Sequence, residues 1–346
     1  MVETPKFVRS VVMTTRIRLA RNLAGFPFPS KMNDHHAAEI LYLVEQGLKK
    51  IDTDAYERYD VGRLKSIEAS LLQEQYLISA ELSKRTESGA AFVSSDKTVS
   101  IMVNEEDHLR EQYICKGFEL LNAYERLSAL DDGLSSVLDF AFDETLGYLT
   151  ACPSNLGTGM RASVMMFLPG LSENGELKKL LPSIKAQGMT VRGAFGEGTN
   201  AEGYMYQVSN ERTLGISELE ILEKMTRVTM GICNLELKAR EEMLKTSETQ
   251  LRDRCLRAYG TLTHCAILSA SEFSQKMLEV RLGTVLGFFK PRDKVGFEDF
   301  FDEMYPATFR ISNGLQGLDE RGCDEIRAET VGNALPELVR IVRKKR

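Results

Sequence analysis

Histidine and cysteine are scarce in this sequence, and none of them falls in a metal-binding pattern. The four histidines form no H-E-x-x-H motif, and the six cysteines form no C-x-x-C pair. We therefore expect no metal site built from protein ligands alone. Scattered cysteines are typical of a reduced cytoplasmic protein rather than of a disulfide scaffold.

Long apolar runs and a large charge excess are also missing. No stretch approaches the length needed to cross a bilayer, and the first residues, "MVETPKFVRSVVMTTR", lack the apolar core of a signal peptide. The net charge is only −6, from 44 basic and 50 acidic residues. Such a balance creates no overall field that attracts nucleic acid or membranes. We expect a cytoplasmic protein that binds neither directly.

The apolar pattern indicates strands in hairpins, interleaved with helices. Alternation predicts a strand over 11–22, and two β-rich runs predict a hairpin over 91–104. "MTVRGAF" and "YMYQVSN" predict a second hairpin around the loop "GEGTNAEG". Helices are expected after Asn104, as N-cap, and from about Arg161 onward. This order favours an antiparallel α+β sheet over repeated parallel βαβ units.

The character of the chain changes after about residue 217. "SELE" predicts a capping box, and charged amphipathic helices follow to the end, where the basic "VRIVRKKR" is expected to be a solvated helix end. With 346 residues the chain is long enough for two domains. We place a catalytic domain at 1–239 and a helical domain at 240–346.

The segment "GYLTACPSNLGTGMRASVMMFLPGL" (147–171) carries a glycine-containing loop of the kind that often holds phosphate. It lacks the lysine of a Walker motif. Its "GTGMRA" satisfies G-x-G-x-x-A, and Glu176 could supply the later acidic residue of a dinucleotide site. However, "CPSNL" separates the strand from the first glycine, and no βαβ frame surrounds it. A nicotinamide site is therefore disfavoured.

Arginines that could bind phosphate recur in four segments of the sequence. They lie in "TTRIR", "NEEDHLR", "GTGMRASVM" and "VRGAFGEG", at Arg16, Arg18, Arg110, Arg161 and Arg192. Guanidinium groups bind phosphate oxygens in a planar fork. Phosphoryl transfer depends chiefly on positioning and on positive charge around the transferred group. An arginine cluster can therefore replace the lysine of other phosphate sites.

Two glutamates and a cysteine suit a cationic acceptor. Glu106 and Glu197 could grip a guanidinium, align one nitrogen with phosphorus and accept its proton, while a Cys152 thiolate helps to hold the cation. Each residue alone is more often a surface charge, a helix ion pair, a loop charge or a small buried side chain. The residues alone therefore indicate a candidate phosphoryl-transfer site and nothing more specific.

Together these segments resemble the signatures of the guanidino (phosphagen) kinase family, in order, over about residues 11–239. The resemblance implies a curved antiparallel sheet flanked by helices, use of ATP with Mg²⁺ held mainly through the nucleotide, and γ-phosphoryl transfer to a guanidinium nitrogen. It implies catalytic roles for Glu106, Glu197, Cys152, Arg110 and Arg161. It implies nucleotide contacts at Thr14, Thr15, Arg16, Ile17, Arg18, Tyr76, Arg110, Arg161, Ala162, Ser163, Val164, Met165, Arg192, Gly193, Ala194, Phe195, Gly196 and Glu197.

The acceptor is expected to be an arginine in a protein. Small-molecule guanidino kinases carry a helical domain before "TRIR"; only thirteen residues precede Thr14 here, so we expect that domain to be absent. The chain instead resembles the bacterial protein-arginine kinases, whose similarity continues through "LRDRCLRAYG" and "VRLG". Two alternatives stay open: a kinase of free arginine or a related guanidino compound, and an inactive adaptor that binds phosphoarginine.

That branch also implies a phosphoarginine pocket and partners. Its R-D-x-x-R-A motif appears here as "CDEIRA", with Asp324 and Arg327 kept and Cys323 in place of the first arginine. The pocket is incomplete by comparison. The implied partners are arginine-bearing protein substrates, an activator of the McsA type, a Clp-type unfoldase and protease, a stress-response repressor and a second copy of the chain. The implied role is in stress response and protein quality control.

Overall fold

The computed structural model describes residues 7–51, 56–85, 88–193 and 202–343. The chain divides into two compact units: Met1–Phe167 with Lys178–Thr199 and Tyr206–Cys233, and Leu168–Leu177 with Asn200–Met205 and Asn234–Arg346. The long helix α6 (Glu218–His264) runs through residue 239, and its backbone leaves helical geometry at Ser247 (φ −140°, ψ 23°). Its start is the expected capping box, in which the backbone N–H of Ser217 donates to Glu220 (2.9 Å).

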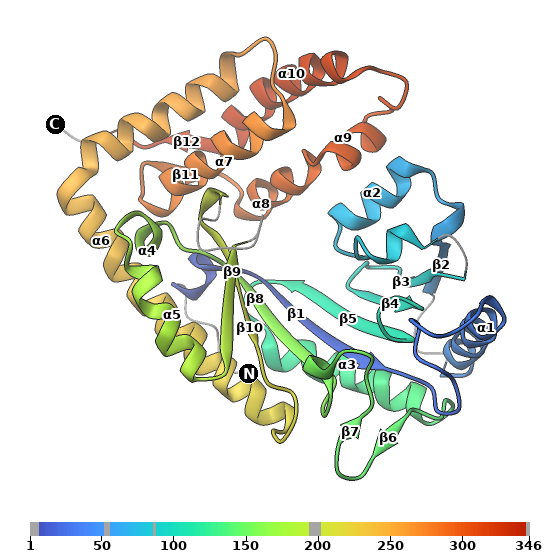
Figure 1. Ribbon diagram of the computed structural model, residues 1–346. Helices are drawn as coiled ribbons and strands as arrows, with labels where there is room; N and C mark the ends of the chain where they lie inside the picture. The colour runs from blue at the N-terminus through green and yellow to red at the C-terminus, as the bar shows by residue number, and fades with distance from the viewer. Residues whose placement is uncertain (1–6, 52–55, 86–87, 194–201, 344–346) are drawn as a thin grey trace. The chain divides into compact units, whose positions relative to one another are not determined.

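The first unit is built on an eight-stranded sheet in the order β2-β3-β4-β5-β1-β8-β10-β9 (Figure 1). Every strand pair with a described register is antiparallel. The strands are β1 (Val12–Arg21), β2 (Tyr56–Asp60), β3 (Ala90–Ser94), β4 (Val99–Val103), β5 (Leu109–Lys116), β8 (Met160–Phe167), β9 (Met189–Gly193) and β10 (Met205–Asn210). The expected strand is β1, and the expected hairpins are β3–β4 and β9–β10. The α+β prediction is confirmed.

Two predicted helices are wrong. Residues 109–116 form the central strand β5 rather than continuing a helix from Asn104, and residues 160–167 form β8, so Arg161 lies on a strand. Both segments pair with β1, the strand at the middle of the sheet. Asn104 does not cap a helix; it adopts a positive φ of 60°, and its side-chain amide donates to the carbonyls of Ala37 and Ser88.

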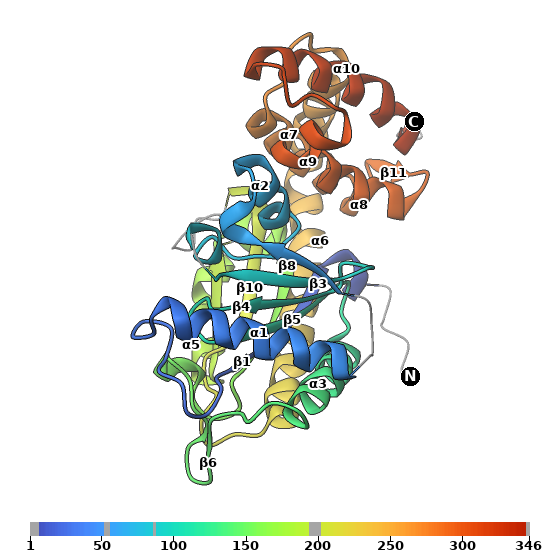
Figure 2. The same cartoon turned by 90° about the vertical axis from the view of Figure 1, so that its right-hand side faces the viewer.

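One face of the sheet is covered by α3 (Leu120–Ser135), with α1 (Asp34–Ile51) packed beside it (Figure 2). Ile17 and Leu19 of β1 are buried, and Arg21, two residues farther along the same face, forms a buried ion pair with Asp131 of α3 (2.8 Å). The alternation of β1 therefore directs its odd-numbered side chains toward α3 and its even-numbered side chains to the opposite face.

On that opposite face, α2 (Ser66–Glu74) and its flanking segments form an apolar cluster against β3 and β4. It comprises Val61, Leu72, Leu77, Ile78, Leu82, Ala91, Val93 and Met102. Met102 pairs with Arg110 across β4 and β5 and so shares its face. This cluster covers one end of the face. Arg110 lies at the boundary between these apolar side chains and the charged part of the face.

The remaining elements of the first unit are short, apart from α5 (Glu176–Ala186), which begins in the second unit. Helix α5 ends two residues before Gly188 and contains Pro182. The other regular elements are the small hairpin β6 (Phe142–Asp143) and β7 (Gly147–Tyr148), and the 3₁₀ turns η1 (Val8–Ser10), η2 (Val61–Arg63), η3 (Leu82–Lys84) and η4 (Pro153–Asn155).

The second unit is mainly helical, as expected. Besides most of α6 it contains α4 (Pro169–Glu173), η5 (Glu202–Tyr204), α7 (Ala270–Val285), α8 (Lys294–Glu303), α9 (Pro306–Ser312) and α10 (Glu320–Leu338). Aromatic contacts form its core, among them Phe273 with Phe300 and Phe301. Within the described ranges, no helix is long and apolar enough to cross a membrane.

The C-terminal tail differs from its prediction. It was expected to be a solvated helix end, but Val339–Ile341 form strand β12, which pairs with β11 (Phe289–Pro291). Val339 is buried whereas Arg340 is exposed. Ile341 is exposed as well, so the strand is held by its backbone pairing with β11 rather than by a buried face.

Candidate functional site

The register of three central strands brings arginines from distant segments onto one face. Arg18 of β1 lies directly opposite Arg161 of β8, and Ala20 lies opposite Arg110 of β5. Directly paired residues, and residues two apart on one strand, share a face. Arg16, Arg18, Arg110 and Arg161 therefore occupy the face turned away from α3.

Arg192 joins them through a neighbouring strand pair. The guanidinium of Arg16 donates to the side-chain oxygen of Gln207 on β10 (3.1 Å), and Gln207 lies opposite Arg192 of β9. The fifth predicted arginine therefore shares the face as well. The sheet therefore brings together all five arginines of the predicted set.

These arginines strain one another electrostatically. Burial, then repulsion from Arg16, Arg110 and Arg161, holds the pKa of Arg18 well below its usual range. Burial and the positive charge of Arg192 also lower the pKa of Arg161. The Nε of Arg18 is buried and has no hydrogen-bond partner among the described residues. A polyanion on this face would relieve the repulsion and supply that partner, so the cluster fits phosphate oxygens.

The remaining nucleotide residues divide by face. Thr14 and Met165 pair with each other, as do Arg16 and Ser163, so these residues share the arginine face. The side chains of Thr15, Ile17, Ala162 and Val164 alternate to the face of α3, where all four are buried. Only their backbone could contact a nucleotide on the arginine face.

Tyr76 lies on the arginine side of the sheet. It follows α2 with a positive φ of 59° and is 45% exposed. Its carbonyl accepts a hydrogen bond from the side chain of Gln112, which lies opposite Arg18 on that face. Gly193 ends β9 opposite Tyr206. Ala194, Phe195, Gly196 and Glu197 lie outside the described residues.

Glu105 was missed by sequence analysis. Its side chain is 2% exposed, and it accepts hydrogen bonds from Arg110 (2.8 Å) and Ser79 (2.7 Å). Its second oxygen accepts the backbone N–H of Glu106 (3.0 Å). Glu105 therefore fixes both Arg110 and the start of the Glu106 turn. In the sequence, the only indication of Glu105 was the pair of adjacent glutamates in "NEED".

Glu106 is the exposed member of this acidic pair. Its side chain is 42% exposed and contacts Arg110 at 3.2 Å. The predicted pairing is therefore present, although Glu106 lies in a turn and Arg110 on a strand rather than on one helix. A carboxylate at the rim of an arginine cluster can exchange its partner for an incoming guanidinium.

Asp107 joins the Glu106 turn to the cysteine loop. Its buried carboxylate accepts hydrogen bonds from Asn22 (2.7 Å) and from the backbone N–H of Ala151 (2.6 Å). Burial raises the pKa of Asp107, against these donors. Because Ala151 precedes Cys152, Asp107 sets the position of the thiol relative to Glu106. "NEED" and "ACPSN" thus meet through a residue that neither motif identified as functional.

Cys152 and Arg161 meet around Ser154. The Cys152 sulfur lies 3.1 Å from the Ser154 hydroxyl, and Arg161 approaches the same hydroxyl at 3.5 Å and the Asn155 side chain at 3.4 Å. Contacts of this length hold a guanidinium weakly. Arg161 is therefore available to an anion.

The two glycines of "LGTG" serve packing rather than direct phosphate contact. A Cβ on Gly157 would lie 2.4 Å from the carbonyl oxygen of Thr213, and one on Gly159 would lie 2.6 Å from that of Ala20. Both residues have positive φ angles, 107° and 66°. They let this loop pass close to β1 and to the segment after β10.

In the second unit, Asp324 and Arg327 lie together on α10. The Arg327 guanidinium is buried, donates to Asp324 (2.5 Å) and to the carbonyl of Leu268 (3.0 Å), and lies over the ring of Phe309. Cys323 beside them is buried. These contacts hold the segment that precedes α7 against helix α10.

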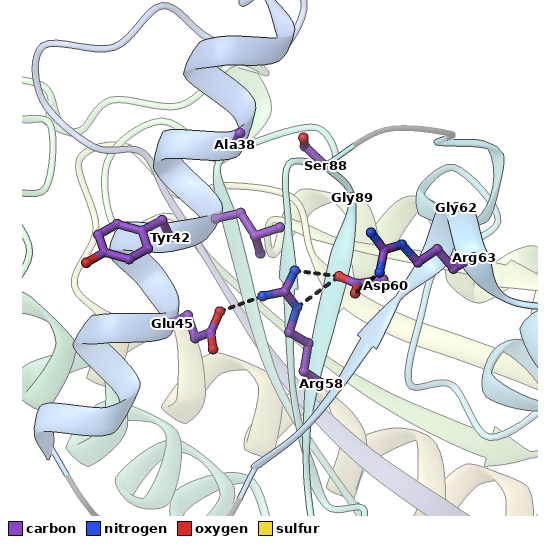
Figure 3. A pocket seen from close by; sticks show the side chains of 10 residues that line it. Ala38, Tyr42, Glu45, Arg58, Asp60, Gly62, Arg63, Ser88 and Gly89 are labelled. Carbon is purple, nitrogen blue, oxygen red and sulfur yellow. Dashed lines mark hydrogen bonds and ion pairs between the residues drawn. The ribbon is translucent and has the colours of Figure 1, made fainter.

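A separate cavity of about 320 Å³ lies between α1 and the β2 region (Figure 3). Arg58 crosses it, bonded to Glu45 and Asp60. None of its lining residues belongs to the predicted site. The arginine face is therefore defined by the sheet register and not by this cavity.

The donor set limits how a metal ion could be held. Among the residues that the structure describes, no group of three His, Cys, Asp or Glu side chains could bind one. The site instead offers cationic groups, which suit a metal ion that arrives bound to a polyphosphate.

Comparison with known proteins agrees with this geometry. The family model "ATP:guanido phosphotransferase, C-terminal catalytic domain" matches residues 39–239, and "Protein-arginine kinase McsB C-terminal domain" matches residues 248–344. A protein-arginine kinase of Caldanaerobacter subterraneus is 40% identical, covering 95% of this chain and 98% of that protein. One of Halalkalibacterium halodurans is 42% identical, covering 81% and 79%.

Solved structures show the same fold. Lombricine kinase aligns with a TM-score of 0.60 at 24% identity, covering 66% of this chain and 67% of that one. The duplicated taurocyamine kinase of Schistosoma mansoni, with bound transition-state analogue components, aligns with a TM-score of 0.64 at 21% identity, covering 82% and 47%.

The chain belongs to the ATP:guanido phosphotransferase family. Within that family it groups with the McsB-type protein-arginine kinases, because residues 248–344 match the model of that branch and its similarity to protein-arginine kinases extends over most of the chain.

Proposed function

We propose that this chain transfers the γ-phosphoryl group of ATP to arginine side chains of proteins. The observation that carries the proposal is the face of five arginines, where the buried Nε of Arg18 has no partner among the described residues and Arg110 contacts the exposed carboxylate of Glu106. Anion-binding and cation-binding groups lie side by side there, as transfer from a polyphosphate to a guanidinium requires. Relatives that are 40% identical are protein-arginine kinases.

In this proposal the arginines bind the triphosphate. The phosphate oxygens are contacted by Arg16, Arg18, Arg110, Arg161 and Arg192. The negative charge that develops on the transferred group in the transition state then lies where the positive charges of these arginines repel one another most. Mg²⁺, bound to the phosphates, would neutralise part of that charge. The protein's own part is to hold the γ-phosphorus in line with the acceptor.

The acceptor guanidinium would bind at the carboxylate rim. Glu106 gives up its contact with Arg110, and Arg110 then binds phosphate. Glu106 instead accepts hydrogen bonds from N–H groups of the incoming arginine. Glu197 and Cys152 also contact this guanidinium. One guanidinium nitrogen loses its proton to a carboxylate and forms the P–N bond, while the bond from the γ-phosphorus to the bridging oxygen of ADP breaks. Deprotonation is needed because a guanidinium ordinarily keeps its proton at neutral pH, and the protonated nitrogen is a poor nucleophile.

The wider proposal assigns residues 1–239 to catalysis and 240–346 to regulation, dimerisation and substrate docking. It includes a homodimer, an activator of the McsA type, a Clp-type unfoldase and protease, and a stress-response repressor, all in the cytoplasm. A phosphoarginine pocket at Asp324 and Arg327 would require Arg327 to exchange its contacts with Asp324 and Leu268 for phosphate.

The test is phosphorylation with ATP and Mg²⁺ of either casein or free L-arginine, followed by mass spectrometry under non-acidic conditions. Phosphoramidate bonds are lost in acid, so the workup must avoid it. We expect phosphoarginine in casein, with a higher kcat/KM than for free arginine. A preference for free arginine would replace the proposal with a small-molecule kinase, and no transfer to either acceptor would favour the inactive adaptor.

A further inference from the structure

An apolar groove lies between the end of α3 and the β6–β7 hairpin, within the first unit. This hairpin groove has a volume of about 590 Å³ and is lined by residues 135–140, Phe142 and Tyr148. Its size falls in the range of roughly 300–1,000 Å³ that is usual for ligand pockets. Val137 is 36% exposed and Phe142 is 58% exposed. Exposed apolar side chains grouped around a cavity are typical of an interaction site.

The aromatic side chains of the groove are fixed on one face of the hairpin, which projects away from the eight-stranded sheet (Figures 1 and 2). Phe142 lies directly opposite Tyr148, so the two rings share a face. The Tyr148 ring contacts Phe142 edge to face, with centroids 5.2 Å apart, and Phe140 at 6.4 Å. The guanidinium of Arg21 lies 3.5 Å from the centroid of the same ring. Tyr148 is therefore held in place, whereas Phe142 remains open to a partner.

The base of the hairpin is tied to the candidate site through Asn22. The backbone carbonyl of Asn22 accepts the N–H of Ala141 (2.7 Å), and its side-chain amide donates to the carbonyl of Leu149 (3.0 Å). The same amide donates to Asp107 (2.7 Å), which also accepts the N–H of Ala151 (2.6 Å). Asn22 therefore connects both strands of the hairpin with the carboxylate that positions the cysteine loop.

The hairpin groove lies within the reach of a short peptide bound at the acceptor position. Tyr148 precedes Cys152 by four residues, so their Cα atoms are at most about 14 Å apart. An extended polypeptide covers the same distance with the same number of residues. An acceptor whose arginine lies beside Cys152 and Glu106 can therefore place a side chain about four residues away in the groove.

The surroundings of the groove are acidic. No lysine or arginine occurs between Arg126 and Arg161. The same stretch contains Asp139, Asp143 and Glu144, which are exposed and form no ion pair with a described residue. We refer to these three residues as the acidic rim. It should attract a segment that is cationic around its arginine and repel an acidic segment.

A second copy of the chain fits this surface less well than a cationic polypeptide. A symmetric pair of chains would use the same patch on both copies. Such an interface would bring two acidic rims together, and like charges across an interface are unfavourable. The charge of the rim therefore favours an arginine-bearing segment as the occupant.

We propose that the hairpin groove binds an apolar side chain of the acceptor polypeptide, about four residues from the arginine that is phosphorylated. The inference rests on the proposed function and deepens it, since it names the acceptor as a cationic segment with an apolar residue at that spacing. The groove binds the polypeptide and takes no part in the transfer. Free arginine has no side chain that could reach the groove, so this contact contributes binding energy only with a polypeptide acceptor.

The test uses peptides that contain one arginine and one tryptophan. The chain itself has no tryptophan, so the peptide's tryptophan fluorescence is observed alone. Two peptides place tryptophan four residues before or after the arginine, and a third has alanine at both positions. We expect the emission of one tryptophan peptide to shift to shorter wavelength when the wild-type protein binds it. Its kcat/KM should be about 10-fold higher than that of the alanine peptide, from burial of aromatic surface.

Variants of the groove connect this preference with Phe142. Phe142→Ala should remove both the fluorescence shift and the preference for tryptophan, and Phe142→Leu should keep part of each because leucine is apolar. Leu121→Ala is the matched control, since Leu121 is 56% exposed on α3 and does not line the groove. It should behave as the wild-type protein does. An unchanged preference in Phe142→Ala would overturn the inference, as would binding of both tryptophan peptides without a shift.

The acidic rim has its own test. Asp139→Asn combined with Glu144→Gln should raise the KM of a peptide with lysine neighbours on the order of 3-fold. Added salt should have the same effect on the wild-type protein. Glu125→Gln, an exposed change on α3, is the control and should leave this KM unchanged. Equal KM values in the double variant and the control would overturn the choice of a cationic segment.

Two further outcomes separate this inference from its alternatives. If Phe142→Ala lowers the solution mass measured by light scattering and leaves the peptide preference unchanged, the groove holds a second copy of the chain. If the wild-type protein phosphorylates only free arginine, or neither acceptor, the proposed function fails. The fluorescence measurement needs no turnover, so a shift that depends on Phe142 still supports the groove as a peptide site, and its absence overturns it.

Discussion

Two adjacent glutamates, Glu105 and Glu106, experience different surroundings, and the difference predicts different mutant phenotypes. Glu105 is buried against Arg110 and Ser79, whereas Glu106 is 42% exposed at the rim. Glu106→Gln should therefore reduce kcat on the order of 10²- to 10⁴-fold, the loss expected for a general base, with ATP affinity nearly intact. Turnover and calorimetric ATP titration measure the two effects. Wild-type turnover would contradict the role of Glu106.

Glu105→Gln should instead weaken the fold. It removes a buried charge that holds Arg110 and the backbone of Glu106, at a cost of about 1–3 kcal/mol in the free energy of unfolding. Urea denaturation of both variants is the direct comparison. Equal stability of Glu105→Gln and Glu106→Gln would show that the buried carboxylate is not structural.

Arg161 makes only long contacts with the described residues, at 3.4–3.5 Å, which makes its substitutions informative. Arg161→Ala should weaken ATP binding and lower kcat together, since the group acts on the phosphates before and during transfer. Arg161→Lys should restore only part of the activity, because a point charge cannot reproduce the bidentate fork. Steady-state kinetics with varied ATP distinguish these outcomes. Full activity of the lysine variant would reduce Arg161 to a source of bulk charge.

At the scale of elements, the loop before β8 depends on close packing at Gly159. A Cβ there meets the Ala20 carbonyl at 2.6 Å, whereas one at Gly117 meets nothing within 4 Å, although both residues have positive φ. Gly159→Ala should therefore cost about 1–3 kcal/mol more than Gly117→Ala in unfolding free energy. Chemical denaturation of the pair isolates the contact from backbone strain, which both share. Equal losses would mean that the loop shifts freely.

Strand β5 buries a carboxyl group, Glu111, whose two oxygens have no donor partner in the described part of the chain. Burial, and then Asp131, raise the pKa of Glu111 well above its ordinary 4.5, while Arg21 lowers it only in part. A raised pKa of an acid means that the fold favours the protonated form. Its contribution to stability is complete below about 4.5 and is lost as pH rises through the folded-state pKa.

Glu111→Gln should remove this pH dependence. The amide can donate toward Asp131 as the protonated acid does, and it carries no charge at any pH. The stability advantage of the variant over wild type should therefore grow as pH rises above the ordinary glutamate value. Urea denaturation across a pH series measures this difference, with Asp132 and Arg21 unchanged in both proteins. A constant difference would indicate that Glu111 does not titrate in the folded state.

The arginine set and the hairpins were predictable from sequence, whereas β5 and β8 were not. Residues 109–116 and 160–167 contain Leu, Glu, Gln, Met, Ala and Arg, which favour helices locally. Pairing on both sides of β1 overrides that preference. Arg110 alternates with the buried residues Leu109 and Glu111, and this is the two-residue period of a strand. The period was hard to recognise in the sequence because one of the buried residues is a glutamate. The roles of Glu105 and Asp107 depend on contacts with distant segments, which spacing alone does not specify.

At the scale of the whole molecule, the arginine face is a place where positive charges repel one another, and a bound nucleotide should reduce that repulsion. The chain carries a net charge of −6, yet the pKa of Arg18 is held well below its usual range by burial and by neighbouring arginines. Binding a polyanion there should stabilise the folded protein by mass action, about 2.7 kcal/mol at 100 times the dissociation constant. Added salt should weaken the effect, because it screens the partly exposed charges.

Thermal unfolding of the full-length chain with ATP, inorganic triphosphate or adenosine tests this expectation. ATP and triphosphate should both raise Tm, since each presents phosphate oxygens to the arginines, whereas adenosine should leave Tm near that of the free protein. The matched variant Arg18→Gln should lose most of the shift, because it removes the buried Nε that has no partner in the described part of the chain. Arg257→Gln, an exposed change on α6, should keep it. A larger shift with adenosine than with triphosphate would mean that the base rather than the phosphate chain dominates binding, and that the arginine face is not the phosphate site.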